Sequence, residues 1–476
     1  MTWLTNHKTL YIVTVLIGVV LLYIRTIAGE FLVGTTTATH PFVEFAGALI
    51  IGGLLVTLLI PLLKSISLSK RDLLILLGIG LFFRALFIGS MPIYEDDWNR
   101  YLWDGAVTAQ GLNPYKYSPT EVVEGALSEN PDIQHLRNYS LANKGATDQY
   151  SLDKYDGAPI TSRINHPDLR TIYPPVAQGI FTWAALISPL NLEVLRGLYL
   201  VVDVLTFFLL IKTLQAYGRD AKWALLYGLN PLLIYSGYNV VHMDLLLMPP
   251  LLLSMLWVKQ GAPVKAGIAL SVASAVKLWP LLLAPIFFRQ WRSQYGAYIM
   301  IALGVAVLSL FLNAPLLLSI GETSGLSAYT GEWERNSFIF PIMVSLFDHI
   351  SIAPGQISRV LVALIVTLIA LYYGFIAKAK DVDIPMALLV TTGALIFLSP
   401  TGYPWYLYWV LIFLPFVPSY GFSILSGLIG LYYVRYGMWE RDIYDLFENL
   451  LVPFQFSVPL LIIGYEILRR RHYAAK

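Results

Sequence analysis

The apolar run LLILLGIGLFF at residues 73–83 is followed, at residues 94–117, by YEDDWNRYLWDGAVTAQGLNPYKY. The first stretch has the character of a membrane helix. The second places Glu95, Asp96 and Asp97 side by side where the chain leaves the lipid, with Arg100 and Asp104 close behind. Adjacent like charges repel, and a carboxylate near hydrocarbon costs more free energy than one in water. We therefore expect this segment to carry a function.

The overall composition predicts a polytopic all-α integral membrane protein. The chain has 476 residues, of which 57% are hydrophobic and only 13% charged, and its mean hydropathy is +0.64. Apolar runs of about 16–20 residues, enough to approach or cross a bilayer core, recur along its length. We expect one transmembrane domain, residues 1–476, in contact with membrane lipid. The net charge of +2 gives no indication of a nucleic-acid partner, and the lack of cysteine excludes disulfides and thiol chemistry.

Basic residues in short loops predict the orientation, because such loops face the cytoplasm. We assign both termini and six basic clusters to that side, at residues 64–71, 212–222, 259–265, 289–292, 378–380 and 469–472. About 12–14 transmembrane helices follow from this assignment. A pair of short helices within 265–288 is expected to break around Lys277 and Pro280. The remaining expected spans are 10–25, 43–63, 73–90, 195–212, 223–240, 244–258, 295–312, 356–377, 383–399, 404–419, 421–436 and 450–467.

The polar loops gather on the other side. That side receives the long loop 91–172, the turn 239–244, the break at Lys277, a second long loop at about 313–355, and the segments 399–405 and 438–448. Residues 173–190 are expected to form a re-entrant or juxtamembrane helix, because a full span there would reverse every later loop. The asymmetry between short basic loops and long polar ones predicts an extracytoplasmic active site.

The acidic segment is predicted to form a juxtamembrane helix over about residues 96–110, with Asp96 or Asp97 at its N-terminus and a glycine–proline stop in GLNP. Helical spacing then places Asp97, Arg100 and Asp104 on one polar face of an amphipathic helix at the membrane surface. Such a row can anchor the helix. It can also supply a general base whose pKa is raised by partial desolvation, or hold a divalent cation. The sequence leaves these roles open.

Polar residues in the other external segments are candidates for substrate contacts. Lys277 lies at membrane depth and is a natural partner for a phosphate, although a lysine reaching to water from a helix end is the plain alternative. His242 and Asp244 occupy a tight turn and can orient a sugar hydroxyl, bind a metal ion or cap the turn. The loop candidates, for which ordinary loop or interfacial roles compete, are His166, Arg170, Tyr173, Trp333, Arg335 and Asn336.

An ordered set of motifs resembles the GT-C superfamily of membrane glycosyltransferases, and most closely the family 87 mannosyltransferases that use polyprenyl-phosphate-mannose. The motifs are YEDDWNRYLWDG, INHPDLRTIYPPVAQ, LNPLLIYSGYNVVHMD, AVKLWPLLLAP, GLSAYTGEWERNSF and LSPTGYPWYLYW. The resemblance implies a GT-C-type bundle with large extracytoplasmic loops. Aminoarabinose transferases of the superfamily carry an Asp three residues before an Arg-Tyr pair, a pattern that falls here on Asp97, so Asp97 is the expected base and Asp96 the second choice. Related enzymes carry an Asp-x-Asp pattern, whereas the acids here are adjacent.

The implied reaction is transfer of a sugar, with mannose as the expected sugar, from a polyprenyl-phosphate carrier to a hydroxyl of a glycan, lipid or glycoprotein acceptor. No cofactor is predicted with certainty, and a divalent cation remains an option. A lipid-linked oligosaccharide ligase or polymerase, or a non-enzymatic lipid or glycan transporter, are the alternative functions. The expected donor-phosphate contacts are Lys277, Arg100, Arg335 and Arg170, and the expected sugar or acceptor contacts are His242, Asp244, His166, Tyr173, Trp333, Asn336 and Asp104.

Overall fold

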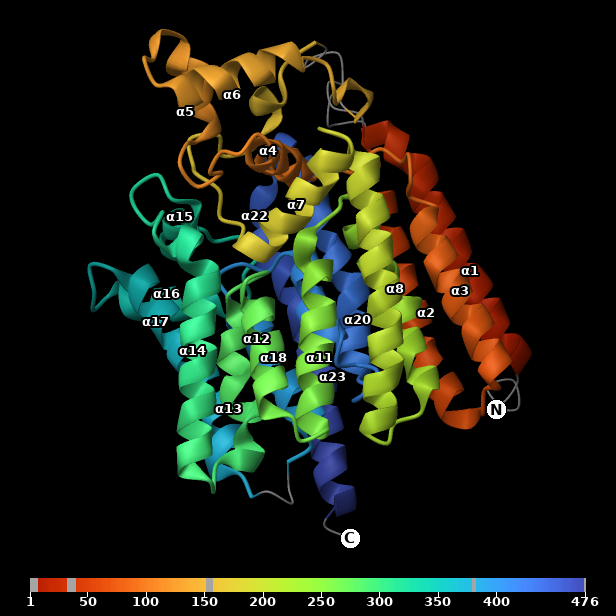
Figure 1. Cartoon of the computed structure of the whole chain (residues 1–476). Helices are drawn as coiled ribbons and strands as arrows, with labels where there is room; N and C mark the ends of the chain where they lie inside the picture. Colours follow the sequence, from red (N-terminus) through yellow and green to blue (C-terminus); the bar gives the residue numbers. More distant parts are fainter. Residues whose placement is uncertain (1–6, 32–39, 151–156, 379–381, 475–476) are drawn as a thin grey trace.

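The computed structural model describes residues 7–31, 40–150, 157–378 and 382–474 (Figure 1). Within these ranges the regular structure is helical, and the only β features are two isolated bridges, Arg170 with Ser324 and Arg335 with Thr401. A helix satisfies its own backbone hydrogen bonds, which lipid cannot do for it. The prediction of an all-α polytopic membrane protein is confirmed.

Six helical segments of the described chain are long and apolar enough to cross a membrane. A seventh is obtained if Pro231–Asn239 and Met243–Lys259, bent by 108° at their junction, count as one span. The six segments, with their helices, are His7–Phe31 (α1, His7–Ile27, and η2, Ala28–Phe31), Phe42–Ser65 (α2), Leu192–Ala216 (α8), Tyr295–Leu317 (α14), Pro354–Ile376 (α17, Pro354–Leu371, and η13, Tyr372–Ile376) and Tyr444–Arg469 (α22, Tyr444–Leu446, η17, Phe447–Leu451, and α23, Val452–Ala474).

The other buried helices are shorter or broken, which is why single helices fall short of the expected 12–14 spans. The predicted span 223–240 is divided at Pro231, and 404–419 is helical only to Leu411. The break predicted within 265–288 is present. These elements are α3 (Lys70–Ala85), η8 (Ala221–Ala224), α9 (Leu225–Gly228), α10 (Pro231–Ile234), η9 (Tyr235–Asn239), η10 (Met243–Leu247), α11 (Met248–Lys259), α12 (Pro263–Ser274), η11 (Trp279–Leu283), α13 (Ala284–Phe287), η12 (Arg289–Trp291), α18 (Ile384–Leu398), η15 (Pro404–Leu407), α19 (Tyr408–Leu411), α20 (Tyr420–Leu428), η16 (Ile429–Tyr433) and α21 (Val434–Glu440).

A cap of short helices covers one end of the bundle (Figure 1). The predicted juxtamembrane helix 96–110 is present as α4 (Asp97–Ala109). It packs closely on α7 (Pro175–Ile187), where a Cβ at Gly105 would lie 2.3 Å from the Phe181 carbonyl oxygen. The rest of the cap consists of α5 (Pro119–Glu124), η4 (Gly125–Leu127), α6 (Pro131–Ala142), η5 (Asp148–Tyr150), η7 (Ile160–Arg163) and α15 (Gly325–Gly331), whereas α16 (Phe340–Asp348) packs on α17.

Two expectations about this cap have different outcomes. Helix α7 is 13 residues long, about 20 Å at the helical rise, and is too short to span the bilayer, as predicted for residues 173–190. Helix α4, in contrast, is not an amphipathic helix lying at the surface. Residues 98–107 are all buried, because α7 and the loops after α4 cover the face that was expected to meet solvent.

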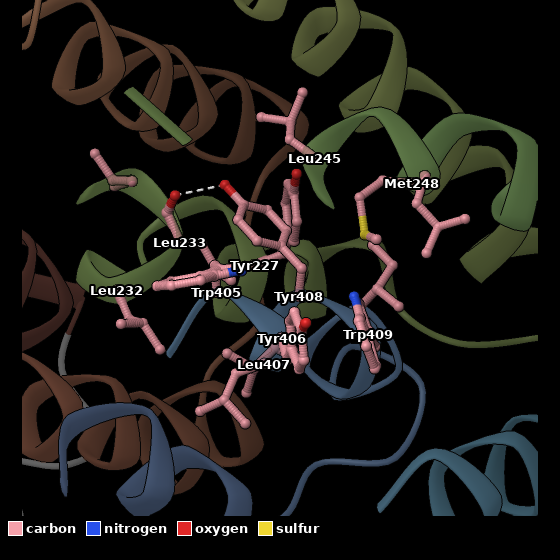
Figure 2. Packing of buried hydrophobic residues seen from close by; sticks show 14 of the residues in the cluster. Tyr227, Leu232, Leu233, Leu245, Met248, Trp405, Tyr406, Leu407, Tyr408 and Trp409 are labelled. Carbon is pink, nitrogen blue, oxygen red and sulfur yellow. Dashed lines mark hydrogen bonds between the residues drawn. The ribbon is translucent and has the colours of Figure 1, made fainter. Parts of the chain in front are cut away.

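The centre of the molecule is an aromatic and aliphatic core built on η15 and α19 (Figure 2). The Tyr408 hydroxyl donates a hydrogen bond of 2.5 Å to the Leu233 carbonyl oxygen, and this bond joins α19 to the broken helix α10. Trp405 and Trp409 come from the same turn of chain and are also buried. The Trp409 indole nitrogen donates to Asp244 at 2.6 Å, so this core directly positions a candidate site residue.

The two ends of the bundle differ in character. The start of α1 and the end of α23 lie at the end opposite α4, α5 and α6 (Figure 1). The basic connections α2–α3 and α11–α12 lie at that same end, whereas the segments expected to form the active site lie at the capped end.

Candidate active site

A cavity of about 830 Å³ opens under the cap and collects the polar segments that the sequence places far apart. This is the size range of sites for drug-sized ligands. Its lining comes from residues within 94–101, 165–174, 243–244, 277–282, 325–335, 359–366, 395–409 and 432–436.

The three consecutive acids open the polar part of this cavity. Asp96 occupies the N-cap position of α4 without a side-chain capping bond, which leaves its carboxylate for other partners. The Asn165 side-chain amide donates to Asp96 Oδ1 at 2.6 Å and to Asp97 Oδ1 at 3.1 Å. One amide group therefore bridges two neighbouring carboxylates and fixes their relative positions.

Burial sets the protonation of these acids. It raises the pKa of Asp96 to about 7, together with the charge of Asp97, while the Asn165 hydrogen bond acts in the opposite direction. Burial also raises the pKa of Asp97 above its usual value, and hydrogen bonding by Asn165 and the charge of Lys277 counteract part of that rise. Asp97 is thus more basic than an ordinary aspartate, while the nearby charge of Lys277 still favours its ionised form.

Lys277 lies beside Asp97 on the cavity wall and is held on three sides. Its ammonium donates to Asp244 Oδ1 at 2.7 Å and lies 4.3 Å from the ring centroid of Tyr406 and 4.9 Å from that of Trp409. Asp244 is almost fully buried, whereas the Lys277 side chain keeps 24% exposure toward the cavity. The arrangement fixes one positive charge at the cavity surface.

His242 approaches Asp97 from behind the cavity wall. Its Nδ1 lies 3.6 Å from Asp97 Oδ2, and its buried ring stacks on Trp405 with centroids 3.7 Å apart. Neither ring nitrogen has a hydrogen-bond partner among the described residues. The separation of 3.6 Å between His242 Nδ1 and Asp97 Oδ2 is longer than a hydrogen bond, and a small side-chain rotation would bring the two atoms into hydrogen-bond range.

Backbone strain marks the same region independently. Positive φ angles occur at Tyr94 (62°), His166 (46°), Val241 (57°) and Asn336 (51°), which line the cavity or adjoin a site residue. Such a φ is a clear outlier for a β-branched residue such as Val241, and each strained residue costs about 1–3 kcal/mol. Strain of this kind persists where the surrounding structure holds functional side chains in place.

The sequence model of glycosyltransferase family 87 matches residues 171–400. This range includes Asp244, Lys277 and Arg335 of the cavity, and it confirms the expected resemblance. The match supports a family 87, GT-C-like glycosyltransferase. The acidic segment at 95–97 lies before the matched range. No curated protein and no solved structure matches the chain.

One wall of the glycosyltransferase cavity is apolar. Side chains of α17, one side chain of α18 and residues just after Lys277 form it. The outer face of α17 is exposed and apolar, so this wall lies where the bundle meets lipid. The apolar lining residues are Leu278, Trp279, Leu282, Val360, Val362, Ala363, Val366 and Leu395.

The predicted arginines that line the cavity differ in how their side chains are hydrogen-bonded. Arg100 lines it, but its Nη2 donates to the carbonyl oxygens of His166 at 3.1 Å and Leu169 at 3.0 Å, so it serves chiefly to fix the loop 165–174. The buried Nε of Arg170 has no partner among the described residues. The Arg335 side chain makes a 3.3 Å bond to a carbonyl of Glu334, which leaves it available for a ligand.

Most predicted site residues line this one cavity. Three of them do not line it. Asp104 is buried behind α4, where it accepts a 2.9 Å hydrogen bond from Gln178 of α7. Asn336 donates to the Gly402 carbonyl at 2.6 Å and ties two loops together. The third, His242, reaches the cavity only through Asp97. The residues that do line it are Asp96, Asp97, Arg100, His166, Arg170, Tyr173, Asp244, Lys277, Trp333 and Arg335.

The sequence reasoning missed several lining residues. Arg435 and Tyr436 belonged to the expected span 421–436, where nothing local distinguishes them from membrane-anchoring side chains. Arg359 was assigned in the same way to the span 356–377. An arginine inside an apolar run is the signal that was available. For the suggested cation, the described residues contain no group of three or more His, Asp or Glu side chains placed to hold a metal ion.

Proposed function

We propose that the enzyme transfers a mannosyl group from a polyprenyl-phosphate carrier to an acceptor hydroxyl on the extracytoplasmic face of the membrane, with Asp97 as general base. The observation that carries this proposal is the placement of Asp97 and Lys277 in one cavity that also has an apolar wall. A lipid-phosphate sugar has three parts, a chain, an anion and a sugar. Each part finds a matching surface there.

The chemistry at Asp97 balances without a cofactor. The acceptor oxygen attacks the anomeric carbon and its proton passes to the Asp97 carboxylate. The bond from the anomeric carbon to the phosphate oxygen breaks, and the electron pair leaves with the lipid phosphate. The raised pKa of Asp97 suits this role, because a more basic carboxylate accepts the proton more readily.

Lys277 supports departure of the phosphate. As the bond to the sugar breaks, the phosphate gains negative charge, and a fixed ammonium stabilises that charge more than it stabilises the singly charged phosphodiester of the ground state. Arg335, Arg170 and Arg359 lie on the same cavity surface and can share the phosphate. Binding of the phosphate to Lys277 competes with the ion pair to Asp244, so Asp244 limits how tightly the product phosphate is retained.

The extracytoplasmic location rests on the charge distribution. The basic connections α2–α3 and α11–α12 lie at the end of the bundle away from the cap, and basic loops face the cytoplasm. The cavity, with its acids, then faces the opposite side. With this proposed orientation, the sugar acceptor would be a molecule of the cell exterior.

The test uses purified enzyme, radiolabelled polyprenyl-phosphate-mannose and total membrane lipid and glycan as acceptors. Asp97→Asn should lower kcat by about 10²–10⁴-fold, the usual contribution of a general base. Asp445→Asn, which removes an exposed carboxylate outside the cavity, is the matched control and should retain full activity. Full activity in Asp97→Asn would remove the base from its role and favour a ligase or polymerase mechanism. No transfer by the wild-type enzyme would refute this donor.

A further inference from the structure

A second charged end of the cavity is built around Arg435 of α21, and neither the predicted reaction nor the family match assigns it a role. The Arg435 guanidinium carbon lies 4.1 Å from the Tyr432 ring centroid and 4.4 Å from that of Tyr436. Its Nη2 donates to the Tyr436 hydroxyl at 2.6 Å, while its buried Nε has no partner among the described residues. The aromatic rings thus hold the guanidinium rigidly and leave donor capacity toward the cavity.

Glu95 is the counterpart of Arg435. It lines the cavity, and its buried Oε1 has no hydrogen-bond partner among the described residues. Glu95 and Arg435 line the same cavity, and burial raises the pKa of Glu95 well above its usual value while the charge of Arg435 counteracts part of that rise. The preceding residue, Tyr94, has a φ of 62° and packs on Tyr436 at 3.9 Å between centroids. A strained turn therefore directs this carboxylate into the cavity.

This end is separate from the Lys277 end. Lys277 is held by Asp244 and the rings of Tyr406 and Trp409. Arg435 is held by Tyr432 and Tyr436 instead. The helices behind them also differ, since α21 packs on α2 whereas most of the apolar wall belongs to α17. Asp97 therefore lies between two differently built ends of one cavity.

We propose that the end formed by Arg435, Glu95 and Tyr436 is the acceptor subsite, and that it takes a carbohydrate acceptor. The proposal rests on the proposed function, because it needs a lipid-phosphate donor at the other end. A donor with a long apolar chain has to lie along α17, which places its phosphate near Lys277. The remaining end offers the carboxyl oxygens of Glu95 as hydrogen-bond acceptors, the N–H groups of Arg435 as hydrogen-bond donors, and tyrosine side chains. These are groups that bind sugar hydroxyls.

The opposing assignment is that Arg435 binds the donor phosphate. A buried, unpaired arginine is a good phosphate ligand. Glu95 argues against it, because its ionised carboxylate would repel a phosphate in the same space, whereas both the neutral and the ionised carboxyl group can bind hydroxyl groups. The two assignments predict different kinetics, so one experiment separates them.

The experiment measures initial rates of the full-length enzyme with polyprenyl-phosphate-mannose and a short alkyl α-mannoside as the acceptor probe, each varied in turn. Arg435→Gln and Glu95→Gln should raise the KM for the mannoside about 10- to 100-fold, the effect of one lost charge-assisted hydrogen bond. The KM for the donor should not change. Arg71→Gln, at an exposed arginine at the start of α3, is the matched control and should alter neither constant.

Each other outcome overturns the assignment. A higher KM for the donor in Arg435→Gln would make this end the phosphate site, and unchanged constants in both variants would deny it a role in binding. If Arg435→Gln does not fold, as judged by thermal unfolding in detergent, Glu95→Gln decides alone. Failure of the wild-type enzyme to use the donor at all would instead refute the proposed function, so the two failures are distinct.

Discussion

Replacing Asn165 by alanine tests how the carboxylate pair is tuned. The amide bridges Asp96 at 2.6 Å and Asp97 at 3.1 Å, and both bonds favour the ionised acids. A hydrogen bond to a charged group contributes about 1.5–3 kcal/mol, and 1.36 kcal/mol corresponds to one pKa unit. Loss of the bond to Asp97 should therefore raise the pKa of Asp97 by about 1–2 units. A water molecule that takes the place of the amide would reduce this rise.

The sign of the activity change follows from the base role of Asp97. Only the ionised carboxylate accepts a proton, so activity falls as the pH drops through its pKa. A higher pKa moves this acid limb toward neutral pH. We therefore expect Asn165→Ala to lose activity at pH 6 while retaining most of it at pH 8.5.

The assay is the pH profile of kcat/KM for mannosyl transfer between pH 5 and 9. Asn143→Ala is the control, because this asparagine lies in the same external loop and donates to the Tyr139 carbonyl at 2.8 Å, away from the cavity. An acid limb at the same pH in wild type and Asn165→Ala would refute the bridging role. So would an equal loss of activity at every pH, which indicates a structural defect.

Three further predictions concern buried charges. Lys277→Met leaves the Asp244 carboxylate buried without its cation and should lower the free energy of unfolding by about 1–3 kcal/mol. The double variant Lys277→Met with Asp244→Asn should recover this stability but not the transfer activity. Thermal unfolding and activity assays measure the two effects. Asp96→Asn should raise the melting temperature more at pH 8 than at pH 5, because a folded-state pKa of about 7 means that stability falls as the pH rises from about 4 to 7. Arg84→Met breaks a fully buried ion pair with Asp203 and should cost about 3 kcal/mol without changing the KM for either substrate; a changed KM would contradict a purely structural pair.

Features of the fold that depend on local sequence could be predicted. The α4 helix follows from its polar start and its Gly-Leu-Asn-Pro end, and the break near Lys277 follows from a charge and a proline within an apolar run. The division of residues 223–240 depends on tertiary contacts, such as the hydrogen bond from Tyr408 to Leu233, which lie 175 residues apart. Hydropathy measures apolar length and carries no information about such bends.

The candidate site likewise has residues that the sequence could predict and residues that depend on tertiary packing. Asp97 and Lys277 stand out because charge is rare in this chain and its position relative to helix ends can be read directly. Asp104 shares a helix face with Asp97, yet the packing of α7 buries it against Gln178. Arg435 could not be connected to Glu95, because their encounter depends on how α21 packs against α2. A helix face defined by spacing becomes a binding surface only where no other element covers it.

The crowding of three consecutive carboxylates has a physical explanation in this arrangement. Each acid meets a different environment, since Glu95 faces Arg435 and Asp97 has Lys277 nearby, while Asp96 lies between them and is half protonated near pH 7. The expected repulsion is therefore reduced by two nearby cations and by protonation, which the raised pKa values of all three acids favour. Because the two cations come from separate ends of the cavity, the acids lie where, under the proposed assignment, a donor held at one end would meet an acceptor held at the other. Adjacent acids, rather than an alternating pair, suit such a site because a turn into a helix directs successive side chains apart.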